Sequence, residues 1–389
     1  MSKSKSDAAQ LPSAAITAFR RTPVCRAGRE LASVDAVTLA AAAARASLAS
    51  EPALAQAVTH AVFGSSRLAG QGVNPARRFA LAAGLAEDTT AVTVTCACAS
   101  GFEALMSAWR MVALGEARAV LVGAGESMSS TPRAMLKDHA DGNAWAFVDL
   151  AERDGLTCTI TGITMPEMAE TIARERGISR TRCEEFVLRS HTRYAQNRDI
   201  HAAAIVPIET EGCTVCADSL PRSAEGLARM AELAPLFPPD GVLTAATASA
   251  IADGGAALIV CHPDLAPSAP RLLAHAVVGI DPSQAPLAPV KALGAMSAHS
   301  GTALSEIGHI EINEGFAPQA IACADMLGLS DDSINRFGGT LAIGHPTGMT
   351  PLRLIGLASD IIRRSSGTAA VSAPVSGGLG FALLLGAGQ

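Results

Sequence analysis

Aromatic side chains and lysines are scarce in this chain. Only 3% of the 389 residues are aromatic, and of the 30 basic residues 26 are arginines and 4 are lysines. The 36 acidic residues outnumber them, which gives a net charge of -6. The arginines are scattered along the sequence, so no basic field exists for nucleic acid and we expect no such partner. A few local arginines can still hold a phosphate or carboxylate group.

Long apolar runs and a secretory signal peptide are also missing. Hydrophobic residues make up 49% of the chain, yet no run approaches the roughly 18 residues that a membrane span needs. We therefore expect no membrane partner. The nine cysteines are odd in number and lie in a long chain, which favours reduced thiols and a cytoplasmic location. The polar N-terminus predicts a mobile tail, residues 1–12.

Apolar runs of strand length alternate with alanine-rich helical patterns. Such runs occupy residues 119–125, 368–375 and 381–386 and predict a parallel α/β sheet. The length corresponds to about two to three domains or to one body with two lobes. We expect one half to comprise residues 13–125 plus 241–265 and a second half to comprise residues 266–389. Residues 126–240 are richer in charge and proline, which predicts an inserted loop domain.

The stretch TVTCACASG at residues 93–101 places two cysteines between a β-branched run and a helical pattern. Ser100 and Glu103 have the S-x-x-E spacing of a capping box, which predicts that the helix begins just after Ser100. Cys98 then lies in the turn that faces unpaired helix amides, where a thiolate is stabilised and the thiol pKa is lowered. Cys96 lacks that field, so Cys98 is the better nucleophile.

Three other interpretations of the cysteines were weighed. A buried free cysteine usually acts as a small apolar residue. Cys96 and Cys98 could join Cys213 and Cys216 as zinc ligands, but C-x-C plus a distant C-x-x-C is a weak pattern and we expect no metal. The Cys213 and Cys216 pair does not follow a strand and precede a helix, as a redox motif would, so packing is favoured.

Several motifs together resemble the thiolase family, from Ala14 to the C-terminus. Any one of them is weak, but their order and spacing are specific. They are RTPV at 21–24, the GQGVNPAR segment within 64–85, CASG at 98–101, GESMS at 125–129, the GISR…LRSH segment at 177–191, DGVLTAATASAIADGGAA at 240–257, NEGFA at 313–317 and GHP at 344–346.

The resemblance implies a five-layered α/β/α/β/α body of two similar halves, with the loop domain covering a coenzyme A site. It implies a homodimer or homotetramer, an acyl-CoA thioester as substrate and no further cofactor. The activity would be that of an acyl-CoA C-acyltransferase, similar to acetyl-CoA acetyltransferases. Such an enzyme forms an acyl-Cys98 intermediate and makes or breaks a carbon–carbon bond of a 3-ketoacyl-CoA.

The residues suit this chemistry, because a thioester carbonyl needs a soft nucleophile, a base and oxyanion donors. Cys98 supplies the sulfur, and His345, in a turn bounded by glycines, is placed to be the base. Asn313, which could otherwise be a helix cap, resembles the family residue that holds a water against the thioester oxygen. The backbone amides of Cys98 and Ser376 are the implied oxyanion donors.

Four further residues follow from the resemblance as binding residues. Arg222 resembles the family arginine near the adenine end of CoA, with an exposed ion pair as its alternative role. Ser249 resembles the serine that touches the pantetheine arm. Phe316 and Phe237 are assigned to the substrate pocket.

One position departs from the family pattern. The family carries a second cysteine near the C-terminus, in C-x-G-G-G-x-G, where this chain reads PVSGGLG at 374–380. Pro374 has no ionisable group, whereas the thiol serves as acid and base in the Claisen step. Nearby serines and Cys96 are poor proton shuttles at neutral pH. We therefore predict an altered second half-reaction, with weak or absent acetyl-CoA thiolysis by the two-base route.

Two alternatives remain open at this stage. A decarboxylating condensing enzyme, similar to ketoacyl synthases, needs only a Cys/His/Asn set, because loss of carbon dioxide generates the carbanion. A non-catalytic or regulatory subunit of the same fold would bind CoA thioesters or a partner protein. The retained Cys98, His345 and Asn313 argue against this second alternative.

Overall fold

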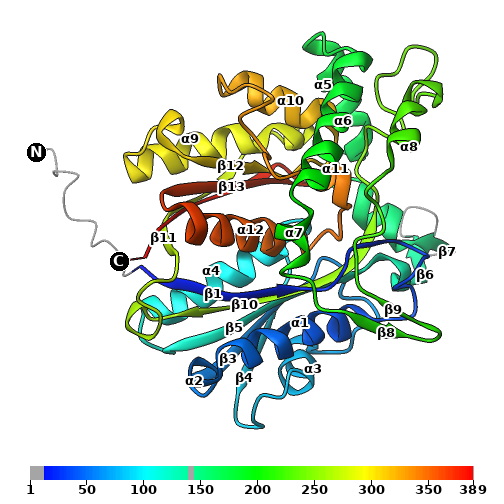
Figure 1. The fold of residues 1–389 in the computed structure, drawn as a ribbon. Helices are drawn as coiled ribbons and strands as arrows, with labels where there is room; N and C mark the ends of the chain where they lie inside the picture. The colour runs from blue at the N-terminus through cyan, green and yellow to red at the C-terminus, as the bar shows by residue number, and fades with distance from the viewer. Residues whose placement is uncertain (1–12, 139–143, 389) are drawn as a thin grey trace, which may run out of the picture.

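The computed structural model describes residues 13–138 and 144–388, so the predicted tail at residues 1–12 lies outside the described part (Figure 1). Its main sheet has ten strands, ordered β12-β13-β14-β11-β1-β10-β5-β3-β4, with the short β2 paired to β10. They are β1 (Ala15–Arg21), β2 (Cys25–Arg26), β3 (Val58–Gly64), β4 (Thr90–Val94), β5 (Ala119–Ser127), β10 (Ala252–Cys261), β11 (Arg271–Gly279), β12 (His309–Ile312), β13 (Thr368–Val375) and β14 (Leu379–Gly386).

The sheet consists of two halves that meet where Ala15 of β1 pairs with Arg271 of β11. Helix α1 (Ala36–Ser50) packs on the outer face of the first half together with α3 (Pro75–Ala82), and α9 (Ala288–Ser300) packs on the outer face of the second. Helices α4 (Ser100–Ala113) and α12 (Thr350–Ser365) lie between the halves, as Figure 1 shows. This arrangement confirms the predicted five layers.

Strand direction differs from the prediction of a parallel sheet. β4, β3 and β5 are parallel, as are β12 and β13, but β10 runs antiparallel to β5 and β1, and β14 runs antiparallel to β13 and β11. A tight turn joins β13 to β14, which forces the chain to reverse. Buried strands of either direction carry continuous apolar sequence, so the pattern alone did not reveal the mixed sheet.

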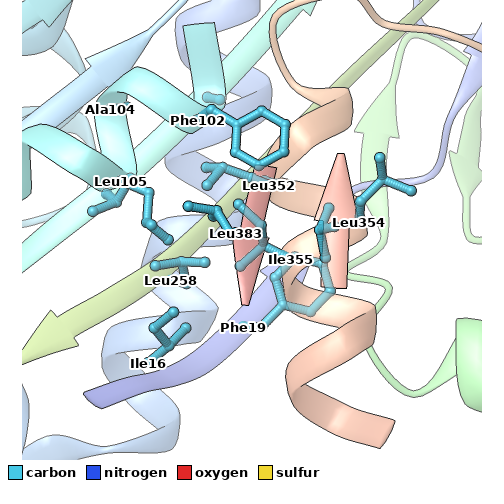
Figure 2. Close-up of a cluster of buried hydrophobic side chains, with 14 of the residues drawn as sticks. Ile16, Phe19, Phe102, Ala104, Leu105, Leu258, Leu352, Leu354, Ile355 and Leu383 are labelled. Atoms are coloured by element: carbon cyan, nitrogen blue, oxygen red, sulfur yellow. The ribbon is translucent and has the colours of Figure 1, made fainter. Parts of the chain in front are cut away.

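The layer between the sheet halves is a dense apolar core. Figure 2 shows Phe102 and Leu105 of α4 facing Leu352 and Ile355 of α12, and all four side chains are buried. Phe102 also stacks on Phe381 of β14, with ring centroids 5.8 Å apart. This packing fixes the first turns of α4 and α12 relative to each other. The loops that precede the two helices are thereby held close together.

Most of the remaining elements belong to the segment between β5 and β10. The segment holds two hairpins, β6–β7 and β8–β9. Its strands and helices are β6 (Arg133–Asp138), β7 (Ala144–Asp149), α5 (Met165–Glu175), α6 (Arg180–Gln196), α7 (Arg198–Ala202), β8 (Ile208–Thr210), β9 (Cys213–Val215) and α8 (Ala224–Ala228). Elsewhere lie α2 (Pro52–Ala55), α10 (Ala317–Met326) and α11 (Thr340–Ile343). In the described ranges, no helix combines the length and apolar character that crossing a bilayer requires.

A buried ion pair connects the segment between β5 and β10 to strand β1. Both terminal nitrogens of Arg21 donate to the Asp218 carboxylate, at 2.6 and 2.8 Å, and the Tyr194 hydroxyl donates to it at 3.0 Å. Burial alone would raise the pKa of Asp218, but the Arg21 guanidinium holds it below its ordinary value. The neighbouring His201 is also buried, and its Nε2 lies 2.7 Å from the Phe337 carbonyl oxygen.

Three buried histidines make stability depend on pH. Burial lowers the pKa of His191 and His201 to about 4 and that of His345 to about 3, against about 6.5 for an unfolded histidine. Below about pH 6.5 the unfolded chain therefore binds more protons than the native one, and the free energy of unfolding falls by about 1.4 kcal/mol per pH unit for each histidine.

Urea unfolding between about pH 7 and about pH 5 measures this effect. The variant His201→Gln should weaken the dependence, whereas His262→Gln, at a histidine whose side chain is 42% exposed, should leave it nearly unchanged. A free energy of unfolding that stays constant across this range would contradict the expectation.

Candidate active site

A cavity of about 310 Å³ brings together residues from both halves of the sheet. Five of the predicted site residues line it: Cys98, Ser249, Asn313, Phe316 and His345. Pro374, at the position of the missing cysteine, lines it as well.

Three predicted residues do not border this cavity in the described part of the chain. Arg222 lies in a separate depression beside His191, whose Nδ1 accepts a hydrogen bond from the Arg222 amide at 3.1 Å. Phe237 borders another depression, beside α5. Ser376 is half-buried in the turn between β13 and β14.

The Ser100 hydroxyl forms hydrogen bonds within the turn that carries Cys98 and does not cap helix α4. Helix α4 begins at Ser100 itself, with Ala99 as its N-cap. The Ser100 hydroxyl accepts from the Cys96 amide at 2.9 Å and donates to the Ala97 carbonyl at 2.7 Å. The predicted capping box is therefore wrong, because the hydroxyl is already used inside the turn. Glu103 pairs with Arg110 on the helix surface, at 2.6 Å.

The Cys98 thiol is neutral at physiological pH. Burial raises its pKa to about 11, which the Arg67 guanidinium opposes and the Glu126 carboxylate adds to. The predicted lowering of this pKa is thus wrong: the cost of burying a sulfur anion exceeds the favourable field of the turn. Cys98 can react as a nucleophile only if a nearby group takes its proton.

His345 is placed to take a proton on Nε2. Its Nδ1 lies 2.8 Å from the Thr350 hydroxyl oxygen, and that hydroxyl donates to the Pro346 carbonyl at 3.2 Å. With its proton on that carbonyl, Thr350 accepts from Nδ1–H, and this tautomer leaves a lone pair on Nε2. Burial and the positive charges of Arg353 and Arg67 lower the pKa of His345 to about 3, so the ring is neutral. The described structure contains no hydrogen bond between this ring and the Cys98 sulfur.

Glycine allows the Cys98 and His345 turns to touch. The amide of Gly101, in the first turn of α4, donates to the carbonyl of Gly348 at 2.9 Å. A Cβ at position 101 would lie 2.9 Å from that oxygen and 3.2 Å from the Leu352 amide nitrogen. Any larger residue would therefore push the two turns apart.

Glu126 connects the His345 turn to the loop after β3. This fully buried carboxylate accepts six hydrogen bonds. Its donors are the amides of Ser66, Arg67 and Gly348 and the hydroxyls of Ser65, Ser66 and Thr347. The sequence contains the motif GESMS at 125–129 but indicates no role for Glu126. Glu126 ties the loop after β3 to the loop that carries His345.

Asn313 is oriented by a chain of hydrogen bonds. Its Oδ1 accepts from the Thr340 hydroxyl at 2.8 Å, and that hydroxyl accepts from Nη2 of Arg353 at 3.1 Å. Because the Thr340 proton is committed to Oδ1, the amide NH₂ group of Asn313 is directed away from this chain, toward the cavity that the residue lines. No local sequence pattern indicates Thr340 or Arg353, because both reach Asn313 through contacts that are distant in sequence.

The cavity has few groups that can exchange protons. Its lining residues include Arg26 and Arg67, but no aspartate, glutamate, lysine or second cysteine. Among the described residues that line it, Cys98 and His345 are the candidates for proton transfer near neutral pH. Ser249 donates its hydroxyl proton to the Gly315 carbonyl at 2.9 Å, so this hydroxyl is held in place by the backbone.

Comparisons with known proteins agree with this geometry. Residues 14–264 match the family described as "Thiolase, N-terminal domain" and residues 266–387 match "Thiolase, C-terminal domain". A β-ketoadipyl-CoA thiolase of Pseudomonas aeruginosa is 35% identical over 362 residues, covering 86% of this chain and 88% of that protein. A probable acetyl-CoA acetyltransferase of Escherichia coli is 35% identical over 351 residues, with the same coverage.

Among solved structures, human mitochondrial 3-ketoacyl-CoA thiolase superposes with a TM-score of 0.91 at 29% identity, covering 97% of this chain and 100% of that one. Acetyl-CoA acetyltransferase of Bacillus anthracis gives a TM-score of 0.90 at 30% identity, covering 97% and 99%. The family matches and the superposed structures agree with the residues that line the cavity. This chain therefore belongs to the thiolase family.

Proposed function

We propose that the chain is an acyl-CoA C-acyltransferase that forms an acyl-Cys98 intermediate and makes or breaks a carbon–carbon bond of a 3-ketoacyl-CoA. The observation that carries the proposal is the shared cavity of Cys98, His345 and Asn313. Relatives named β-ketoadipyl-CoA thiolase and acetyl-CoA acetyltransferase support it, as does a similar structure that is titled as a complex with CoA.

In the first half-reaction the Cys98 sulfur attacks the thioester carbonyl carbon while Nε2 of His345 takes the thiol proton. Both groups are neutral beforehand, so the proton leaves the sulfur as the bond from sulfur to carbon forms, and the negative charge develops on the carbonyl oxygen. The amide of Asn313, through a water, and the backbone amides of Cys98 and Ser376 donate to the oxyanion. CoA then leaves as a thiol with the proton returned by His345, and the acyl group stays on Cys98.

The second half-reaction differs from that of the two-cysteine enzymes. A carbon nucleophile must lose a proton, and Pro374 offers no group to accept it. The other lining residues supply no second base. This favours slow condensation or thiolysis with acetyl-CoA. It also gives a reason for a second candidate function, a decarboxylating condensation, in which loss of carbon dioxide creates the carbanion without a base.

The remaining assignments complete the proposal. Arg222 and Ser249 bind CoA, Phe316 and Phe237 face the acyl or pantetheine chain, and residues 126–240 form the loop domain over the site. The enzyme acts in the cytoplasm as a homodimer or homotetramer and takes no metal or cofactor besides its CoA thioester.

Acylation of Cys98 is the direct test of the proposed function. Incubation with short-chain acyl-CoAs should add the mass of the acyl group to the peptide that contains Cys98, as seen by mass spectrometry. The variant Cys98→Ala should lose the adduct, whereas Cys96→Ala, two residues away and outside the cavity lining, should keep it. Absence of an adduct with every acyl-CoA would favour the non-catalytic subunit.

The variant Pro374→Cys tests the altered second half-reaction. If the missing thiol limits the reaction, Pro374→Cys should raise acetyl-CoA condensation by about 100-fold or more, the range for a general base, and Pro374→Ser should not. Release of CoA and formation of acetoacetyl-CoA measure the rate. Unaltered protein that already condenses acetyl-CoA as fast as the variant would contradict this account. Product formed from malonyl-CoA but not from acetyl-CoA would select the decarboxylating candidate.

A further inference from the structure

Arg67 is a buried cation in the wall of the cavity. It lies in the loop after β3, where its amide donates to Glu126 at 3.1 Å and its carbonyl accepts from the side chain of Gln71. Only 9% of the residue is exposed. The backbone on both sides of Arg67 is thus held by hydrogen bonds, which fixes where its side chain begins.

The guanidinium group of Arg67 is only partly satisfied. Nη1 donates to the carbonyls of Asp154, at 2.9 Å, and Ser66, at 3.3 Å. Nε is buried without a hydrogen-bond partner, and within the described ranges no carboxylate forms an ion pair with this arginine. The edge formed by Nε and Nη2 therefore has no protein acceptor at Nε, and such an edge matches the two oxygens of a carboxylate.

The backbone of Gly155 packs closely against this edge. It lines the same cavity, and a Cβ at position 155 would lie 2.4 Å from Nη2 and 3.4 Å from Nε of Arg67. Glycine therefore allows the backbone to approach the guanidinium group closely. A side chain here would displace Arg67 or cover the edge.

The surroundings suit an anion near the reacting sulfur. Arg67 lines the cavity with Cys98, and its charge acts on both the Cys98 thiol and the His345 ring. Met128 and Leu156 provide apolar wall in the same cavity. A buried cation without a counter-ion is unfavourable, so an anionic group brought by a ligand would be stabilised here.

We propose that Arg67 binds a carboxylate at the far end of the acyl group carried to Cys98, so that the chain prefers CoA thioesters of dicarboxylic acids. This inference rests on the proposed acyl transfer to Cys98. The apolar wall would contact the methylenes between the thioester and the carboxylate. A malonyl carboxylate that must leave as carbon dioxide is the less suitable occupant, because a paired guanidinium stabilises the carboxylate and opposes its loss.

Matched pairs of acyl-CoAs test the proposal. The rate of Cys98 acylation is measured with succinyl-CoA against butyryl-CoA and with glutaryl-CoA against pentanoyl-CoA. The unaltered protein should prefer the carboxylate member of at least one pair by about 10- to 100-fold, the effect of a hydrogen-bonded charge. Arg67→Met should abolish the preference, and Gly155→Ala should weaken it. Arg78→Met, at an exposed arginine of α3, should keep it.

The ratio within a pair separates substrate recognition from other roles of Arg67. Equal rates within both pairs in the unaltered protein would overturn the proposal. So would an equal loss for both members in Arg67→Met, which would make Arg67 a counter-ion of the sulfur. Arg67-dependent decarboxylation of malonyl-CoA without any preference in the pairs would overturn it too.

Failure of the proposed function is recognised separately, as no adduct from any acyl-CoA. In that case calorimetric binding of succinyl-CoA and butyryl-CoA decides the role of Arg67. Tighter binding of succinyl-CoA that is lost in Arg67→Met supports the carboxylate site, and equal affinities overturn it. Circular dichroism of each variant confirms that it is folded.

Discussion

The Glu126 carboxylate is the contact on which the geometry of the site depends. Its oxygens accept from three backbone amides and three hydroxyls, in loops that precede it by about 60 residues and follow it by more than 220. Replacing it would leave those amides buried and unpaired, at a cost of about 1–3 kcal/mol each. Through Gly348 it holds the His345 loop, and through its bond to the Arg67 amide it sets where that side chain enters the cavity.

Burial then determines how the site can react. The same enclosure that raises the Cys98 pKa lowers that of His345, so the cavity holds a neutral thiol beside a neutral base. Thr350 fixes the tautomer of that base, and Thr340 fixes the amide of Asn313. Such a pair develops charge only when a carbonyl carbon is available for attack. In the proposed reaction the absence of a thiol at Pro374 would limit the following step, in which a carbon acid must be deprotonated.

The motifs sufficed to predict the fold class and to select Cys98, Asn313 and His345, which the structure places around one cavity. The local sequence pattern around Ser100 gave a wrong prediction. Ser100 satisfies the capping spacing in sequence, yet its hydroxyl closes the cysteine turn. Glu126 and Arg67 were missed because their partners are distant in sequence.

Several features expected from the sequence remain predictions. They include the roles of Arg222, Phe237 and Ser376, the domain boundaries and the oligomer. The direction of β10 and β14 was hidden because buried strands look alike in sequence.

The central claim is that a neutral Cys98 thiol gives its proton to Nε2 of His345. Alkylation of Cys98 by iodoacetamide, followed by peptide mass spectrometry across a range of pH, tests this most directly. The account predicts a rate that changes little across neutral pH, because the thiol and the ring are both neutral there, and that is lower in His345→Ala. A rate that rises about tenfold per pH unit through this range, as for a thiolate formed without the ring, or one that His345→Ala leaves unchanged, would contradict it.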